Sequence, residues 1–123
     1  MIIGIGTDIA EVDRIAKSNG KTGFREKVFS AGEIAYRETK VNKAESYAAR
    51  FAAKEAFFKA LGTGWRGGMA FNEVEVCNDE LGKPTLNILG KTAEIIKENN
   101  IKIIHVSLSH IKDVAMATVV LEG

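Results

Sequence analysis

Four charged side chains interrupt an apolar stretch in the middle of this 123-residue chain. In RFAAKEAFFKALGTG, residues 50–64, Arg50 and Lys54 are four positions apart, and so are Glu55 and Lys59. Residues four apart lie on one face of a helix. Because a buried charge is costly unless it is paired or binds something, these four residues are candidates for a site that holds a metal or an anion.

A simpler interpretation of the same charges stays open. Glu55 and Lys59 would form an ion pair along the helix, while Arg50 and Lys54 would reach past the apolar surface to water. Two unlike charged sets on so apolar a helix, followed at once by the turn at residues 62–64, favour the binding site. Such a turn offers backbone N–H donors to phosphate oxygens.

Asp8 is the second candidate for the same site. It follows an expected strand at residues 2–7, in which Gly4 and Gly6 allow backbone or ligand to approach closely. Asp8 and Glu55 together would bind a hard divalent cation and leave several coordination positions for water and phosphate oxygens, as magnesium favours.

Asp8 also has a purely structural explanation. Glu11 follows three residues later, so the two side chains could form a capping box for a short helix that runs to Ile15. The sequence does not choose between the cap and the metal ligand.

The rest of the chain predicts an α+β fold, with a mostly antiparallel sheet wrapped around the long helix. In the strand at residues 101–110 the apolar and polar side chains alternate, so that one face packs and the other displays His105, Ser107 and Ser109. The other expected elements are a short helix near residues 24–29, a helix over about 31–39 opened by a Ser30–Glu33 capping box, the long helix from about 42–45, a hairpin of 71–76 with 83–89, a helix at 91–99 and a nearly continuous apolar central strand at 114–121.

Length and composition predict one soluble domain over residues 1–123. The net charge of +1 gives no general attraction to nucleic acid or membrane, although residues 13–27 hold five basic side chains against two acidic ones. Cys77 is the only cysteine, so an intramolecular disulfide is excluded. No signal peptide or membrane-spanning stretch is recognisable, and we expect a cytoplasmic protein.

Four segments, in this order and spacing, resemble the holo-acyl-carrier-protein synthase family of small phosphopantetheinyl transferases. They are GIGTDIAEVDRI near the start, RFAAKEAFFKALGTG in the middle, LGKP at residues 81–84 and HVSLSH at 105–110. The resemblance covers essentially the whole chain and implies the 4'-phosphopantetheinyl transferase fold.

The resemblance also implies a reaction of fatty acid biosynthesis. Phosphopantetheine passes from coenzyme A to a serine of apo acyl carrier protein, with Mg²⁺ as cofactor, adenosine 3',5'-bisphosphate as the other product, and a homotrimer that shares sites between subunits. Asp8 and Glu55 match the family's magnesium ligands, and Lys59 matches the lysine beside the pyrophosphate. The residues that the resemblance places against coenzyme A are Arg50, Lys54, Gly62, Thr63, Gly64, Lys83, Pro84, Thr85 and His105. Arg14 matches a residue that meets the carrier protein, and Lys21, Phe24 and Arg25 belong to the same expected surface.

Two other function classes use the same residues. A metal-dependent phosphohydrolase or nuclease would also need Asp8 and Glu55, but would release phosphate or nucleotide without an acceptor protein. A coenzyme A or nucleotide-binding module without catalysis would bind its ligand with little dependence on magnesium.

Overall fold

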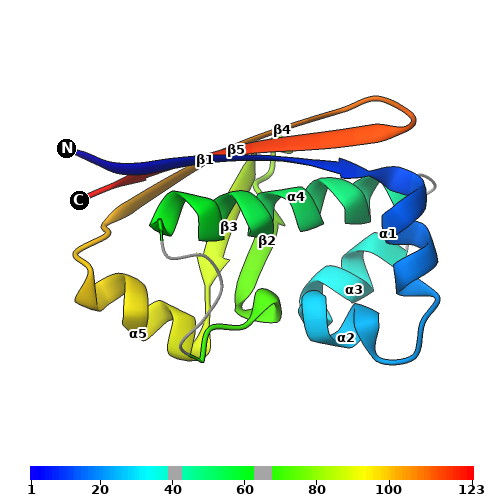
Figure 1. Cartoon of the computed structure of the whole chain (residues 1–123), viewed down its shortest axis with the longest axis horizontal. Coiled ribbons are helices and arrows are strands. Elements are labelled where there is room, and N and C mark those ends of the chain that lie inside the picture. The colour runs from blue at the N-terminus through cyan, green and yellow to red at the C-terminus, as the bar shows by residue number, and fades with distance from the viewer. Residues whose placement is uncertain (39–42, 63–67) are drawn as a thin grey trace.

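The computed structural model describes residues 1–38, 43–62 and 68–123. A three-stranded sheet forms the upper layer, the long helix α4 (Lys43–Leu61) lies beneath it, and the shorter elements form a third layer (Figure 1). The elements of the third layer are α1 (Val12–Asn19), α2 (Phe24–Val28), α3 (Ala31–Glu38), the 3-10 helix η1 (Phe71–Glu73), β2 (Val74–Asn78), β3 (Pro84–Ile88) and α5 (Gly90–Glu98).

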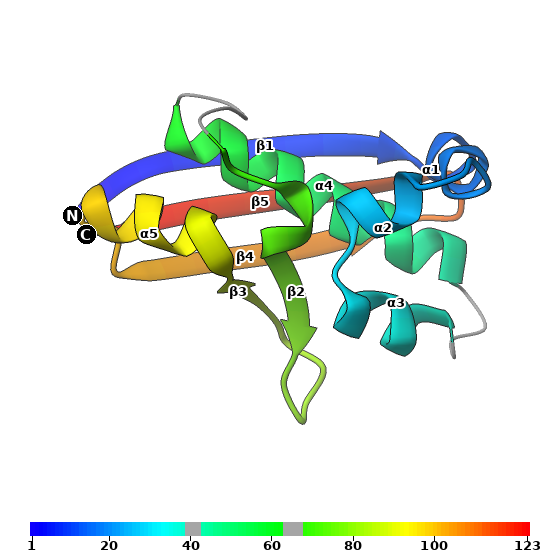
Figure 2. The same ribbon diagram turned by 90° about the horizontal axis from the view of Figure 1, so that it is seen from below.

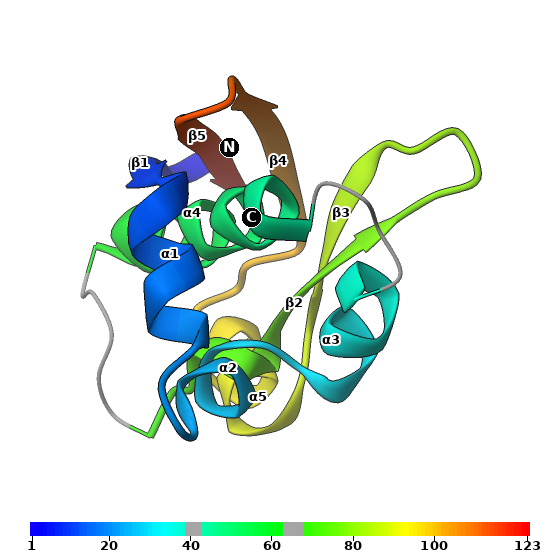
Figure 3. The same cartoon turned by 90° about the vertical axis from the view of Figure 1, so that its right-hand side faces the viewer.

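The large sheet has the order β1-β5-β4 and is antiparallel throughout. Its strands are β1 (Ile2–Glu11), β5 (Val114–Glu122) and β4 (Ile103–His110). The apolar strand β5 lies in the centre, as its sequence predicts. The α+β fold and the antiparallel sheet around a long helix are therefore confirmed, with β2 and β3 forming a second, separate antiparallel hairpin that projects from the body of the molecule (Figures 2 and 3).

Two glycines let β1 lie directly on α4. A Cβ atom added at Gly4 would stand 2.0 Å from the carbonyl oxygen of Ala60, and one at Gly6 would stand 2.1 Å from that of Ala56. Backbone approaches backbone here, as the sequence predicts, and this contact fixes the distance between the strand that carries Asp8 and the helix that carries Glu55.

The capping box at the start of α3 is also confirmed. The Ser30 hydroxyl accepts a hydrogen bond from the Glu33 N–H at 3.1 Å, and the Glu33 carboxylate accepts one from the Ser30 N–H at 2.9 Å. Glu33 is almost completely buried, so this carboxylate has further partners inside the protein.

The capping hypothesis for Asp8 is wrong. Strand β1 does not end there but continues to Glu11, and Asp8 pairs with Ala117 of β5. Helix α1 begins at Val12 and has no side-chain cap. A continuing ladder of hydrogen bonds to β5 satisfies the backbone groups that a cap would have served. Another expected strand begins later than predicted, because residues 71–73 form η1.

One face of the large sheet packs on α4, and in the part of the chain that the structure describes no helix or strand covers the other (Figures 1 and 3). This outer sheet face carries Ile5, Ile9, Ile103 and Met116, which are between 40% and 68% exposed. Among the described helices, none has the length and apolar character needed to cross a membrane.

Candidate active site

The first candidate cavity lies where β1 passes over α4. It has a volume of about 240 Å³, and Asp8, Arg14, Phe51 and Glu55 are among the residues that line it. The two carboxylates that the sequence singled out are therefore brought together, and a basic residue of α1 stands at the same cavity.

The environment of Glu55 disfavours the charged form of its carboxyl. Burial raises the pKa of the Glu55 carboxyl, and the negative charge of Asp8 raises that pKa further, against the opposing effect of Lys59 and Arg14. A divalent cation between the two carboxylates would relieve this repulsion. Glu11 also lines the cavity, but among the described residues no three histidine, cysteine or acidic side chains come close enough together to hold one metal ion. A cation held by Asp8 and Glu55 would keep other coordination positions open, which fits magnesium.

Lys59 does not pair with Glu55. Its ammonium group donates to the Asp8 carboxylate and to the Thr7 carbonyl, both at 3.0 Å. The simple ion pair along the helix is therefore absent, and Lys59 instead reaches across to β1. Its side chain is 55% exposed, so the ammonium group remains accessible to a ligand.

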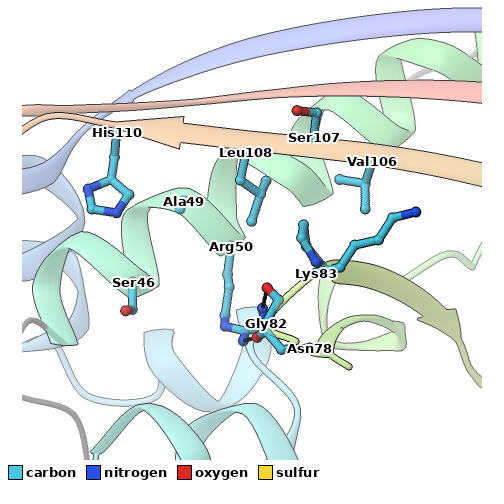
Figure 4. Close-up of a pocket in the computed structure, with 11 residues that line it drawn as sticks. Ser46, Ala49, Arg50, Asn78, Gly82, Lys83, Val106, Ser107, Leu108 and His110 are labelled. Atoms are coloured by element: carbon cyan, nitrogen blue, oxygen red, sulfur yellow. Dashed lines mark hydrogen bonds between the residues drawn. The ribbon is translucent and has the colours of Figure 1, made fainter. Parts of the chain in front are cut away.

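Arg50 borders the second candidate cavity, which has a volume of about 420 Å³. The cavity lies between α4, the end of β4 and the turn of the β2–β3 hairpin (Figure 4), and its other lining residues include Ser46, Asn78, Lys83, Pro84 and His110. Arg50 is nearly buried, and burial lowers the pKa of its guanidinium. Its Nε atom has no hydrogen-bond partner among the described residues. An oxygen of a phosphate would satisfy that donor.

Lys54 does not lie where the prediction placed it, against a phosphate of coenzyme A. Its side chain is completely buried, and its ammonium group donates to the Glu33 carboxylate at 2.7 Å, to the Phe71 carbonyl at 3.0 Å and to the Val74 carbonyl. An ammonium group has three donors, and all three are used. Lys54 is therefore unavailable to a phosphate, and neither it nor Arg50 reaches out to water as the simpler interpretation had it.

Glu33 is the residue that sequence reasoning missed. Besides the Ser30 N–H and Lys54, its carboxylate accepts the Val76 N–H at 3.0 Å and lies 3.9 Å from a terminal nitrogen of Arg50. The capping box was visible in the sequence, but the second role was not. The available signal was that two buried cations on one helix require a buried carboxylate.

The hairpin contributes only part of what the sequence predicted. Lys83 and Pro84 line the cavity beside Arg50, whereas Thr85 does not. Successive residues of a strand point to opposite faces, and Thr85, the next residue of β3 after Pro84, is exposed on the other face.

His105 lies away from both cavities in the single chain. It belongs to the outer sheet face, where its Nε2 atom is 2.5 Å from the carboxylate of Glu122 on β5. The residues of β4 with the opposite orientation, Val106 and Leu108, line the cavity at Arg50 (Figure 4). Gly62 follows the last residue of α4 and has a φ of 80°, and Thr63 and Gly64 lie outside the described residues.

The expected carrier-protein surface is uneven. Arg14 and Lys21 are exposed, in α1 and in the turn that follows it. Arg25 is engaged by the carboxylates of Glu26 and Glu38, and Phe24 is half-buried against the core. Arg14 and Lys21 are therefore the free cations of this predicted set.

The two cavities share no lining residue. Asp8 and Glu55 face one side of α4, and Arg50 with the hairpin turn faces another. In this chain the predicted site residues are thus divided between two separate cavities.

Comparisons with known proteins agree with the resemblance seen in the sequence. The sequence model of the 4'-phosphopantetheinyl transferase superfamily matches residues 4–119. The chain belongs to this superfamily. It is 49% identical to the holo-[acyl-carrier-protein] synthase of Solibacter usitatus, over 100% of both chains, and 46% identical to that of Syntrophus aciditrophicus, over 100% of this chain and 98% of the other.

Solved structures of the superfamily share the fold. The crystal structure of holo-[acyl-carrier-protein] synthase from Neisseria meningitidis superposes with a TM-score of 0.92 at 37% identity, over 100% of both chains. The holo-(acyl-carrier-protein) synthase of Bacillus anthracis, in complex with CoA (3',5'-ADP), has a TM-score of 0.81 at 40% identity, and the match covers 98% of this chain and 96% of that one.

Proposed function

We propose that this protein transfers the 4'-phosphopantetheine group from coenzyme A to a serine of apo acyl carrier protein and releases adenosine 3',5'-bisphosphate. The observation that carries the proposal is the pair Asp8 and Glu55, brought to one cavity beside Lys59 and Arg14. Relatives with 49% and 46% identity over the full chain are named holo-[acyl-carrier-protein] synthases, which supports the same reaction.

The residues divide the work of phosphoryl transfer. Asp8 and Glu55 would hold Mg²⁺, which would neutralise charge on the diphosphate of coenzyme A. Lys59, with its exposed ammonium group beside Asp8, would stabilise the charge that grows toward the leaving bisphosphate. Arg50, Lys83 and Pro84 would bind the nucleotide end of coenzyme A. The group that accepts the serine proton is Glu55 or a water molecule beside it.

Arg14 belongs to the same picture, because it lines the cavity that holds Asp8 and Glu55. A carrier protein that docks with its acidic surface on Arg14 and Lys21 would bring its serine close to the two carboxylates. A cytoplasmic location and a single domain over residues 1–123 stay predictions, the latter supported by one continuous buried core.

We infer that the complete site forms between subunits. Asp8 belongs to β1, which is one edge of the sheet, whereas the cavity at Arg50 reaches β4, which is the other edge. A closed ring, such as the expected homotrimer, would place the β1 edge of one subunit against the β4 edge of the next, and would cover the exposed outer sheet face that carries His105.

Transfer is tested by incubating the protein with coenzyme A, Mg²⁺ and apo carrier protein and weighing the carrier protein. A gain of one phosphopantetheine group that depends on Mg²⁺ supports the proposal. Glu94→Gln, a change on the exposed surface of α5, should transfer at the wild-type rate. Hydrolysis of coenzyme A without modification of the carrier protein would instead favour a phosphohydrolase, and binding without any reaction would favour a binding module.

The shared site is tested by mixing two inactive variants, Glu55→Ala and Arg50→Ala, after dissociation and reassociation. If each site needs Glu55 from one subunit and Arg50 from its neighbour, random mixing should restore about a quarter of wild-type activity. Each variant alone, treated in the same way, is the control. A fully active monomer in sedimentation would overturn the shared site.

A further inference from the structure

Asn78 has no role in the reaction proposed above. It is the last residue of β2 and lines the cavity of about 420 Å³ at Arg50. It also lines a neighbouring cavity of about 250 Å³ beside Tyr36 and Cys77, whose lining includes Arg50 as well. Asn78 therefore stands next to the Arg50 guanidinium at the wall between two cavities.

Both ends of the Asn78 amide are engaged, and each end holds a different element. Its Oδ1 atom accepts a hydrogen bond from the Arg50 Nη2 atom at 2.5 Å, and its Nδ2 atom donates to the Gly82 carbonyl at 2.9 Å. Figure 4 shows Arg50 of α4 and Gly82 of the hairpin turn meeting at this side chain. Asn78 thus links the cation of the cavity to the turn that carries Lys83.

The hairpin turn does not need Asn78 for its own geometry. The Asp79 carboxylate accepts the N–H groups of Leu81 and Lys83 at 2.9 and 2.8 Å. The Asp79 N–H donates to the Lys83 carbonyl, and the Gly82 N–H donates to the Asp79 carbonyl, both at 2.9 Å. Four hydrogen bonds to Asp79 already close the turn, so the bond from Asn78 serves to join the turn to Arg50.

The chemistry of the junction requires an amide. The side toward Arg50 must accept a hydrogen bond from a cation, and the side toward Gly82 must donate one to a carbonyl. The Val76 carbonyl also accepts a hydrogen bond from Nη1, and the guanidinium lies over the Tyr36 ring, 5.7 Å from its centroid. With Nη1 and Nη2 both held by β2, the guanidinium is fixed in one plane, and its unpartnered Nε is presented in a fixed direction.

We propose that Asn78 is a positioning residue for coenzyme A, which orients Arg50 and holds Lys83 beside it in the same cavity. This inference rests on the proposed function, because it takes coenzyme A as the ligand. Asn78 acts through Arg50 and the turn. It strengthens coenzyme A binding because Arg50 and Lys83 are already ordered before the phosphates arrive, so binding does not have to supply the free energy of ordering them.

The test measures the dissociation constant of coenzyme A by calorimetry for the wild type and for Asn78→Ala. We expect binding to weaken about tenfold, the effect of losing a hydrogen bond to a charged group. The turnover number and the KM for carrier protein should stay within about twofold, since neither depends on the order of the nucleotide pocket. Asn87→Ala is the matched control: Asn87 lies on β3 of the same hairpin, bonds only to Glu75 among the described contacts, and should bind coenzyme A as the wild type does.

A double-mutant cycle separates positioning from simple stabilisation of the hairpin. In the background of Arg50→Met, which keeps an apolar stem and removes the guanidinium, Asn78→Ala should change coenzyme A affinity by less than about twofold. An equal tenfold loss in both backgrounds would overturn the inference, and so would Asn78→Ala that melts earlier but binds coenzyme A normally. If the wild type binds coenzyme A and transfers phosphopantetheine, and Asn78→Ala has the same coenzyme A affinity, the role of Asn78 is wrong while the proposed function stands. A wild type that does not bind coenzyme A at all defeats the proposed function as well.

Discussion

The two charged sets of α4 have the same spacing in sequence and opposite environments in the fold. Arg50 and Lys54 are turned inward and are matched by Glu33 and by backbone carbonyls. Glu55 and Lys59 are turned toward β1, where Glu55 lies beside another carboxylate and Lys59 is exposed. The inward-facing charges therefore hold neighbouring elements together, whereas the pair facing β1 leaves Glu55 beside another carboxylate, a repulsion that a divalent cation would relieve.

The reason for the inner arrangement is an open strand edge. Among the described strands β2 pairs with β3 alone, so its other edge presents N–H and C=O groups that have no partner strand in this part of the chain. The Lys54 and Arg50 side chains donate to the Val74 and Val76 carbonyls, and Glu33 accepts the Val76 N–H. Side-chain charges thus replace a missing strand, which explains why they are tolerated inside the protein.

The largest effect on the transfer rate should come from Glu55, one of the two charges that face β1. Glu55→Gln should reduce transfer by roughly a thousandfold or more, about 4 kcal/mol of transition-state stabilisation, because a neutral amide cannot replace a carboxylate ligand of the metal. The free energy of unfolding should change by less than about 1 kcal/mol, since the change removes a half-buried charge beside Asp8. Activity assays and urea unfolding of the same preparation measure both quantities.

Variants of Asp8 test whether Asp8 and Glu55 bind the same metal ion. Asp8→Ala should be as inactive as Glu55→Gln, and the double variant should be little worse than either alone, because both residues serve one ion. Nearly full activity of Asp8→Ser would remove Asp8 from the site.

Changes to the buried charges around Arg50 and Lys54 should lower the stability of the fold. Glu33→Ala should lower the free energy of unfolding by about 3 kcal/mol or more, because it leaves Lys54 as an unpaired buried charge. Glu26→Ala is the matched control: this carboxylate is 58% exposed and pairs with Arg25, and its loss should cost less than about 1 kcal/mol. Equal costs in chemical denaturation would contradict the distinction between inner and outer charges.

The smallest effect is expected from Arg14, the exposed cation at the cavity of Asp8 and Glu55. Arg14→Glu should raise the KM for carrier protein about fivefold and leave coenzyme A affinity unchanged, because an exposed cation acts mainly on the encounter with an acidic partner. Added salt should weaken wild-type binding and narrow the difference, since the Debye length at physiological ionic strength is about 8 Å. A defect that does not depend on salt, or one confined to coenzyme A, would place the docking surface elsewhere.

The sequence by itself determined the features that depend on neighbours along the chain. Alternation in β4, the glycines that bring β1 onto α4 and the capping box of Ser30 and Glu33 were all predictable, because a strand period, a missing side chain and a helix end are local properties. The four family segments also placed Asp8 with Glu55, and the fold brings both to one cavity.

Only the tertiary structure decided which partner each charge takes. Lys54 meets a carboxylate 21 residues earlier in the chain and a carbonyl 20 residues later, and Arg50 meets Asn78 28 residues later. No periodicity records such distances, so the sequence assigned Lys54 to a phosphate and gave Asn78 no role. The division of the site into two halves has the same origin: β1 and β4 are at opposite edges of the sheet because β5, the last strand in the chain, pairs between them.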